Sequence, residues 1–190
     1  MPKKSRVLPS GLSPAAEVRA RKIRVLMLDV DGVMTDGKVC LQAFPDGSVH
    51  EMKQFNAHDG AGLKLAQDAG LKTGVISGRD SAAVRKRAAE SGMEFVYQGR
   101  EHKMGAYEEF LLAANVEDSQ VAYMGDDLPD IPLLRRVGLA VAVANAAPEV
   151  KRAAHVVTKR TGGDGAVREV IECILKAQGK WNSLAPNARA

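Results

Sequence analysis

The sequence has few of the features that mark nucleic-acid-binding, membrane or secreted proteins. Aromatic residues make up only 4% of the 190 residues, which is too few for the stacking platforms that bind single-stranded nucleic acids. No apolar run approaches the roughly 18 residues of a membrane span, and no apolar segment of a signal peptide follows the basic residues near the N-terminus. The two cysteines, Cys40 and Cys173, show no pairing pattern. These absences favour a cytoplasmic protein with neither a membrane nor a nucleic acid as its partner.

The sequence also lacks a large excess of positive or negative charge. Lysine and arginine total 27 against 23 acidic residues, and this small, scattered excess suits an anionic small molecule as well as any larger partner. The chain is long enough for one domain with a substantial core. We expect a leader at 1–22, a single domain at 23–178 and a tail at 179–190.

Within this domain the sequence alternates between strand and helix patterns. The nearly continuous apolar run 23–28 predicts a buried parallel strand, and turn residues at 45–47 predict a β-hairpin over 38–55. Further strands are predicted at 72–76, 94–97, 120–124, 139–143 and 155–158, and helices at 60–70, 81–91, 103–114, 129–136, 148–153 and 165–178. Asp80 is the expected N-cap of the second of these helices. The alternation predicts an α/β fold with a doubly wound, Rossmann-like parallel sheet and active residues at the strand ends.

Two carboxylates, Asp29 and Asp31, directly follow the first predicted strand. A phosphate-ester hydrolase can use such a pair, because one carboxylate attacks phosphorus while the other protonates the leaving oxygen and then activates water. Both groups need a divalent cation nearby, since carboxylate and phosphate repel each other. A calcium loop is the plainer alternative, but here a strand precedes the loop and Cys40 occupies the position of the final glutamate ligand.

Three weaker signals follow at later strand ends. Ser77 precedes a glycine and a predicted helix, which together can bind an anion. Lys103 lies near a helix start, and Asp126 belongs to the acidic segment 125–130, which suits an oxygen-ligated cation. Each signal alone is also typical of a turn, a solvated lysine or a helix cap. Their order along the chain, each at a strand end, argues for one site.

This ordered set resembles the haloacid dehalogenase superfamily. The resemblance narrows to the 3-deoxy-D-manno-octulosonate 8-phosphate phosphatase family through the segments 29–37, 55–60, 97–99 with Lys103, 125–127 and 165–169. It covers residues 23–180 and implies a haloacid dehalogenase fold without a cap domain. It also implies a Mg²⁺-dependent homotetramer that hydrolyses the sugar-acid phosphate in lipopolysaccharide synthesis through an aspartyl-phosphate.

The resemblance further implies a role for each matching residue. Asp29 is the nucleophile, Asp31 the acid and base, and Ser77 and Lys103 hold the phosphoryl group. Asp29, Asp126 and the backbone carbonyl of Asp31 are the metal ligands. The substrate-binding positions are Asp31, Asn56, Ala57, His58, Asp59, Gly60, Lys64, Arg79, Arg87 and Lys103. Of these, His58 and Lys64 stand where arginine is common in the family, and Asp164 departs in the same way near the C-terminus.

The candidate site contains more basic side chains than a phosphate group and a metal ion would need as partners. Lys64, Arg79 and Arg87 favour a second anionic group on the substrate, such as a carboxylate, although Arg87 can equally lie on a solvated helix face. A nine-carbon nonulosonate 9-phosphate is the nearest alternative substrate. Relatives that act on such acids tend to carry glutamate at the position of Arg79, which favours the eight-carbon acid.

Two alternatives belong to other functional classes. A receiver domain also phosphorylates an aspartate at a strand end, but it lacks an acid and base such as Asp31 two residues further on. A catalytically dead assembly domain is the other alternative, and the complete motif set argues against it.

The predicted hairpin bears on assembly. The segments 37–77 and 79–103 are too short to hold a folded cap, so another element must shield the site from water. The hairpin carries more apolar surface than a free flap should expose, at Val39, Leu41, Phe44, Val49 and Met52. We therefore expect a homotetramer whose hairpins pack together. The alternative is a hairpin folded back on its own domain.

Overall fold

The chain folds around one parallel β-sheet. The structure is a computed structural model and describes residues 11–184. The six strands lie in the order β5-β4-β1-β6-β7-β8, and each neighbouring pair is parallel. Their bounds are β1 Val25–Leu28, β4 Lys72–Ile76, β5 Phe95–Tyr97, β6 Val121–Gly125, β7 Leu139–Ala142 and β8 Val156–Val157. The predicted doubly wound sheet is confirmed.

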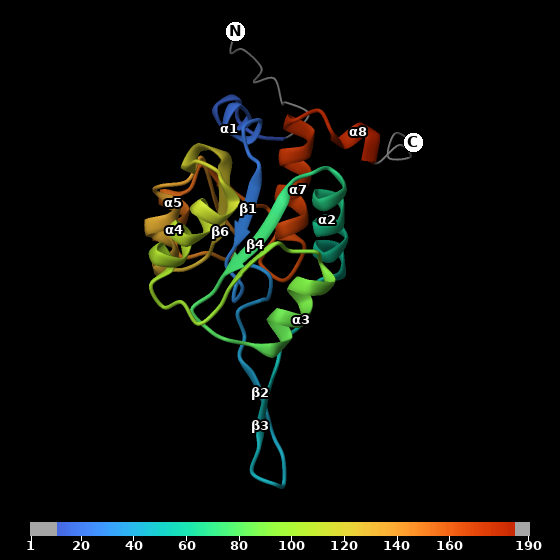
Figure 1. Cartoon of the computed structure of the whole chain (residues 1–190), viewed down its shortest axis with the longest axis vertical. Helices are drawn as coiled ribbons and strands as arrows, with labels where there is room; N and C mark the ends of the chain where they lie inside the picture. Colours follow the sequence, from blue (N-terminus) through green and yellow to red (C-terminus); the bar gives the residue numbers. More distant parts are fainter. Residues whose placement is uncertain (1–10, 185–190) are drawn as a thin grey trace.

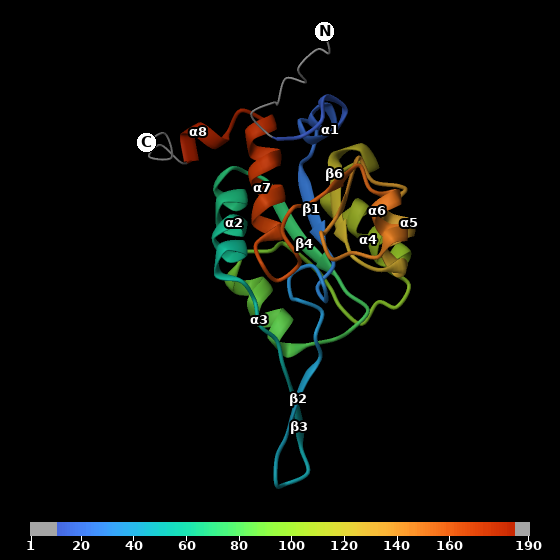
Figure 2. The same ribbon diagram turned by 180° about the vertical axis from the view of Figure 1, so that it is seen from behind.

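Helices cover both faces of the sheet. On one face α2 (Ala57–Asp68) packs against α7 (Ala166–Ala177), which also contacts α1 (Pro14–Ala20). On the opposite face lie α4 (Lys103–Ala114) and α5 (Ile131–Leu134), as Figure 1 and Figure 2 show. The other helical segments are α3 Ala82–Glu90, η1 Asp118–Gln120, η2 Leu128–Asp130, α6 Pro148–Ala153 and α8 Trp181–Leu184. The sheet is therefore buried on both faces, which explains the continuous apolar run of β1.

The strand order reverses next to β1. From β1 the chain continues into β4 and β5 on one side, and then crosses to β6, β7 and β8 on the other. The register aligns Leu28 of β1 with Val75 of β4 and Met124 of β6. The carboxyl ends of these three strands therefore lie side by side at a switch point, where open α/β sheets bind ligands.

The hairpin projects from this body. Its strands β2 (Cys40–Ala43) and β3 (Val49–Met52) pair antiparallel and extend away from the sheet beyond the arrowheads of β1 and β4 (Figure 1). At the turn, Asp46 accepts the backbone N–H of Ser48 at 2.9 Å. The predicted apolar side chains are exposed by 39–61%: Phe44 39%, Met52 50%, Val39 56%, Val49 60% and Leu41 61%. The hairpin thus does not fold back on its own domain.

Two helix starts differ from the sequence prediction. Helix α2 begins three residues earlier than predicted, because Asn56 caps it by accepting the backbone N–H of His58 at 2.7 Å. The N-cap of α3 is Ser81 and not Asp80, whose carboxylate pairs with Arg85 instead. A side-chain hydrogen bond therefore accounts for the start of α2, whereas Ser81 makes no capping side-chain bond at the start of α3.

Both predicted terminal segments contain short helices. Helix α1 falls within the expected leader and α8 within the expected tail, while residues 1–10 and 185–190 lie outside the described part of the chain. None of the helices formed by residues 11–184 is long and apolar enough to cross a membrane.

Candidate active site

The loop after β1 brings its backbone against Asp126. The N–H of Asp29 still donates to the carbonyl of Met124 in β6, at 2.9 Å. The loop then turns at Gly32, whose φ of +92° is rarely adopted by other residues. A Cβ at Gly32 would lie 2.0 Å from an oxygen of Asp126. Glycine therefore allows the loop after β1 and the end of β6 to meet.

A second segment holds this loop from the C-terminal part of the chain. The N–H of Gly163 donates to the carbonyl of Val33 at 3.1 Å. Asn145 bridges the two segments, since its amide donates to the carbonyl of Gly32 at 3.3 Å and accepts from Gly162 at 2.8 Å. These bonds fix the loop from outside the predicted motifs.

Asp29, Lys103 and Asp130 form a buried charge cluster. Asp29 and Lys103 are each only 8% exposed, and the ammonium of Lys103 lies 2.8 Å from Asp29 and 2.7 Å from Asp130. Asp130 also accepts the hydroxyl of Tyr123 at 2.7 Å and the backbone N–H of Asp126 at 2.9 Å. Because Asp130 is engaged by these donors, it orients Lys103 and the turn after β6.

The crowded carboxylates resist ionisation. Burial raises the pKa of Asp29 to about 6, although Lys103 opposes this shift. Burial, and then the charges of Asp29 and Asp130, raise the pKa of Asp126 to about 8. Burial lowers the pKa of Lys103, but Asp29 and Asp130 raise it by more, so the net shift is upward. A cation between the carboxylates would relieve their repulsion.

The donor set fits a hard divalent cation. Asp29, Asp126 and Asp130 each offer an oxygen, and these oxygens lie within 4.8 Å of one another. One oxygen of Asp126 is buried and has no hydrogen-bond partner among residues 11–184. Oxygen ligands of this kind suit Mg²⁺. Asp29 and Asp126 thus fit the predicted ligand roles, and the third predicted ligand, the carbonyl of Asp31, belongs to the same loop.

Asp31 lies in the loop after β1, and Ser77 lies at the end of the neighbouring strand β4. The carboxylate of Asp31 pairs with the ammonium of Lys53 and lies 3.7 Å from Arg79. Ser77, at the end of β4, is only 4% exposed and accepts the backbone N–H of Arg79 at 3.2 Å. Its hydroxyl proton can therefore donate to a bound phosphoryl oxygen.

Several predicted substrate positions gather at the start of α2. The side chain of Asn56 donates to the carbonyl of Gly163 at 3.4 Å, next to the loop after β1. Arg87 packs closely over Gly60, where a Cβ would lie 2.1 Å from its guanidinium. Ala57 is exposed at the first turn of the helix. These four residues can border a substrate that extends from the loop.

Three other predicted substrate positions point elsewhere. The buried carboxylate of Asp59 accepts the backbone N–H of Arg168 at 2.8 Å and holds the start of α7. The side chain of Lys64 is 65% exposed and pairs with Asp68 at 2.9 Å. His58 lines a hollow of about 500 Å³ beside α7. Direct substrate contact by these three side chains stays a prediction.

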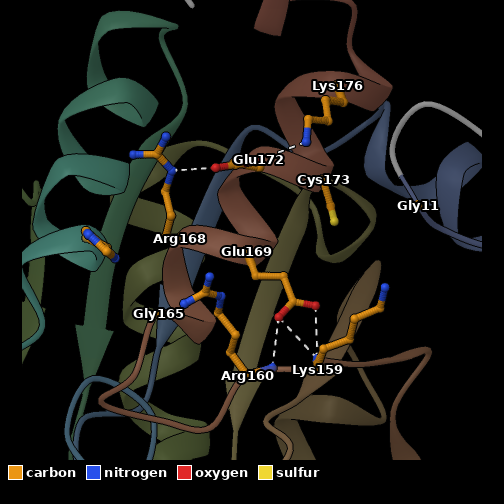
Figure 3. A pocket seen from close by; sticks show the side chains of 10 residues that line it. Gly11, Lys159, Arg160, Gly165, Arg168, Glu169, Glu172, Cys173 and Lys176 are labelled. Carbon is orange, nitrogen blue, oxygen red and sulfur yellow. Dashed lines mark hydrogen bonds and ion pairs between the residues drawn. The ribbon is translucent and has the colours of Figure 1, made fainter. Parts of the chain in front are cut away.

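The hollow beside α7 is a separate feature. Glu169 accepts the backbone N–H groups of Lys159 and Arg160, and Glu172 pairs with Arg168 at 2.7 Å (Figure 3). None of the residues that line it belongs to the Asp29 cluster. Within the hollow, Glu172 thus pairs with the side chains of Arg168 and Lys176, whereas Glu169 holds only the backbone of Lys159 and Arg160.

The sequence analysis missed several residues of the site. Lys53 and Glu51 lie two residues apart around the end of β3, a spacing that places both on one face of a strand. That alternation is a usable signal. Asp130 lay within the segment assigned to the metal site without a role of its own, and Tyr123 and Asn145 carried no sequence signal.

Comparison with known proteins gives the family. Residues 93–171 match the haloacid dehalogenase-like hydrolase family. The 3-deoxy-D-manno-octulosonate 8-phosphate phosphatase of Salmonella typhimurium is 41% identical over 169 residues, which are 89% of this chain and 88% of that protein. A probable YrbI family phosphatase from Pseudomonas syringae is 46% identical, with a TM-score of 0.84 over 90% of this chain and 95% of that one.

A third relative was solved with ligands. The 3-deoxy-D-manno-octulosonate 8-phosphate phosphatase of Moraxella catarrhalis, in complex with magnesium, phosphate and KDO, is 36% identical. Its TM-score is 0.85 over 90% of this chain and 96% of that one. The fold and the aspartate-rich loop are those of a haloacid dehalogenase-like hydrolase. Within that class, the chain belongs to the family of 3-deoxy-D-manno-octulosonate 8-phosphate phosphatases.

Proposed function

We propose that this chain is a Mg²⁺-dependent phosphatase that hydrolyses 3-deoxy-D-manno-octulosonate 8-phosphate through an aspartyl-phosphate. The observation that carries the proposal is the buried Asp29, with Lys103 at 2.8 Å and Asp126 close enough to share a cation. The names of the relatives supply the substrate. The proposed setting is lipopolysaccharide synthesis in the cytoplasm.

In the first step, an oxygen of Asp29 attacks phosphorus and the sugar oxygen leaves. Lys103 neutralises charge on the phosphoryl oxygens, and the hydroxyl of Ser77 donates to one of them. Asp31 protonates the leaving oxygen. When bound by Asp29, Asp126 and the Asp31 carbonyl, Mg²⁺ supplies the positive charge that lets a carboxylate approach a phosphate.

In the second step, the aspartyl-phosphate is hydrolysed. Asp31, now ionised, takes a proton from a water molecule, which attacks phosphorus and releases Asp29 as a carboxylate. Phosphate then leaves, and the enzyme is restored. The two carboxylates therefore divide nucleophilic and proton-transfer work between them.

The substrate carboxylate has a candidate partner in Arg79. This side chain is 46% exposed and reaches Asp31, so it combines access to solvent with closeness to the reaction centre. A guanidinium can bind a carboxylate in a bidentate manner. Arg87, beside Gly60 and Asn56, is the second candidate.

Phosphate release from a panel of substrates tests this proposal. The panel contains the eight-carbon sugar-acid 8-phosphate, a nine-carbon nonulosonate 9-phosphate and neutral hexose phosphates, each with Mg²⁺ and with a chelator. We expect the highest kcat/KM for the eight-carbon acid and no turnover with the chelator. A preference for the nine-carbon acid would replace the substrate assignment, and equal turnover of neutral phosphates would contradict carboxylate recognition.

A further inference from the structure

A lysine at the base of the hairpin is unusually buried. Lys53 directly follows β3, and its side chain is only 2% exposed. Lysine is almost never fully buried unless its charge is paired. The contacts of Lys53 should therefore explain why the chain keeps an ammonium group at this position.

The partners of Lys53 include the proposed acid and base. Its ammonium pairs with one carboxylate oxygen of Asp31 at 2.5 Å and with Glu51 at 3.3 Å. Arg79 contacts Glu51 as well, and its Nε lies 3.7 Å from the other oxygen of Asp31. These four residues form a hairpin-base cluster of two cations and two carboxylates.

The two cations of the hairpin-base cluster, Lys53 and Arg79, differ in how far their side chains are exposed to solvent. The side chain of Arg79 is 46% exposed, and the proposed function uses it to bind the substrate carboxylate. Lys53 is enclosed, and leaving a buried charge without its partner is costly. Lys53 can therefore remain paired with Asp31 while Arg79 binds the substrate carboxylate.

We infer that Lys53 is a positioning residue, which holds the Asp31 carboxylate in the orientation needed to exchange a proton with the leaving oxygen. The inference rests on the proposed function. Because Lys53 directly follows β3, its ion pair with Asp31 also connects the base of the hairpin to the reaction centre. Displacing a reacting group by about 1 Å can cost about 10²-fold in rate, so such positioning matters.

The leaving group provides the test. A sugar alkoxide must be protonated as it leaves, whereas 4-nitrophenolate leaves without a proton. In Lys53→Met we expect kcat/KM for the sugar-acid phosphate to fall by about 10²-fold, and kcat/KM for 4-nitrophenyl phosphate to fall far less. Lys38→Met is the matched control, because Lys38 lies on the other arm of the hairpin with its side chain 84% exposed. It should leave both values unchanged.

A double-mutant cycle provides the second measurement. If Lys53 acts through Asp31, Lys53→Met should cost little more once Asp31 is replaced by asparagine. The Mg²⁺ concentration that gives half-maximal activity should stay as in the wild type, because Lys53 contacts the side chain of Asp31 and not the carbonyl proposed as a ligand. Lys53→Arg, which keeps the charge, should retain more activity than Lys53→Met. If Lys53→Met does not fold, Lys53→Gln, which also removes the charge, replaces it in both tests.

Equal losses with both leaving groups, or additive losses in the cycle, would overturn the inference. The same holds if wild-type activity persists in a folded Lys53→Met. In each of these outcomes the wild-type enzyme is an active phosphatase, so the proposed function stands. An inactive wild-type chain would instead overturn the proposed function and the inference with it.

Discussion

Two carboxylates that are neighbours in the sequence have different surroundings. Asp29 is buried beside Lys103, and burial raises its pKa to about 6. Asp31 faces the cations of the hairpin base, Lys53 and Arg79. Such unequal environments are how similar groups take separate chemical roles. We propose that Asp29 is the nucleophile because it lies beside Lys103 and Asp126, which can hold a phosphoryl group and a cation, and that Asp31 transfers the proton.

Gly32 gives a prediction about the metal site. Gly32→Ala would place a Cβ 2.0 Å from Asp126 and force that carboxylate aside. We expect Mg²⁺ affinity to fall by about 10–100-fold, measured by the rise in Tm on adding Mg²⁺. Gly47→Ala is the matched control, because its φ of +82° is similar but a Cβ there meets open space. An unchanged response to Mg²⁺ in Gly32→Ala would contradict the placement of Asp126.

Arg79 gives a prediction about specificity. Arg79→Ala removes the exposed guanidinium beside Asp31, so the preference for acidic over neutral sugar phosphates should narrow. The measurement is the ratio of kcat/KM values for the two substrate classes. Arg85→Ala, at a side chain that is 56% exposed and pairs with Asp80, is the matched control. A ratio that does not change in Arg79→Ala would rule out carboxylate recognition by this residue.

At the scale of elements, His155, directly before the edge strand β8, is hydrogen-bonded to β7. Nδ1 of His155 accepts the backbone N–H of Ala140 in β7 at 2.9 Å, so the ring must be unprotonated at that nitrogen. Partial desolvation, followed by the charge of Arg19, lowers the pKa of His155 below its usual 6.5. The folded state therefore binds this proton less tightly than the unfolded state does. The stabilisation is fully present above the unfolded pKa of about 6.5, and it is lost as pH falls from that value through the lower folded pKa.

Urea unfolding at several pH values tests this hydrogen bond. The free energy of unfolding of the wild type should decrease between pH 8 and about pH 5, in part through His155. His155→Asn keeps an acceptor but cannot titrate, so the difference in stability between the two proteins should shift in favour of the variant as pH falls. Parallel pH curves would contradict the role assigned to His155.

Most elements could be predicted because their signals are local. Strand β4 coincides with the predicted 72–76, and α4 with the predicted 103–114, since periodicity and flanking residues set both. The helix predicted at 129–136 instead divides into η2 and α5. The carboxylate of Asp130 turns back to accept the N–H groups of Asp126 and Asp127, which tightens this segment into a 3₁₀ turn. That bonding depends on side-chain direction, which the pattern does not reveal.

At the scale of the whole molecule, the sequence predicts mainly those site residues that directly follow a strand. Asp29, Ser77 and Asp126 each follow a strand, so the topology brings them together. Lys53 and Asn145 were missed because their partners lie far along the chain, at separations of 22 and 113 residues. Only the folded chain brings such pairs into contact.

The exposed hairpin gives a prediction about assembly. We propose a homotetramer in which hairpins from four chains pack together, because a folded protein rarely exposes so much apolar surface on one projection. Light scattering should report a tetramer for the wild type and a smaller species for Val49→Asp, whose native side chain is 60% exposed. Leu112→Asp on α4, where the leucine is 84% exposed, should remain tetrameric. A fully active monomer of the wild type would contradict this assembly.

The rate of phosphate release by Asp29→Asn tests the central claim most directly. The amide cannot attack phosphorus, so no aspartyl-phosphate can form, while the similar shape should preserve the fold. With saturating Mg²⁺ and the eight-carbon sugar-acid 8-phosphate, we expect a folded protein without measurable turnover. Turnover by a folded Asp29→Asn protein near the wild-type rate would contradict covalent catalysis by Asp29.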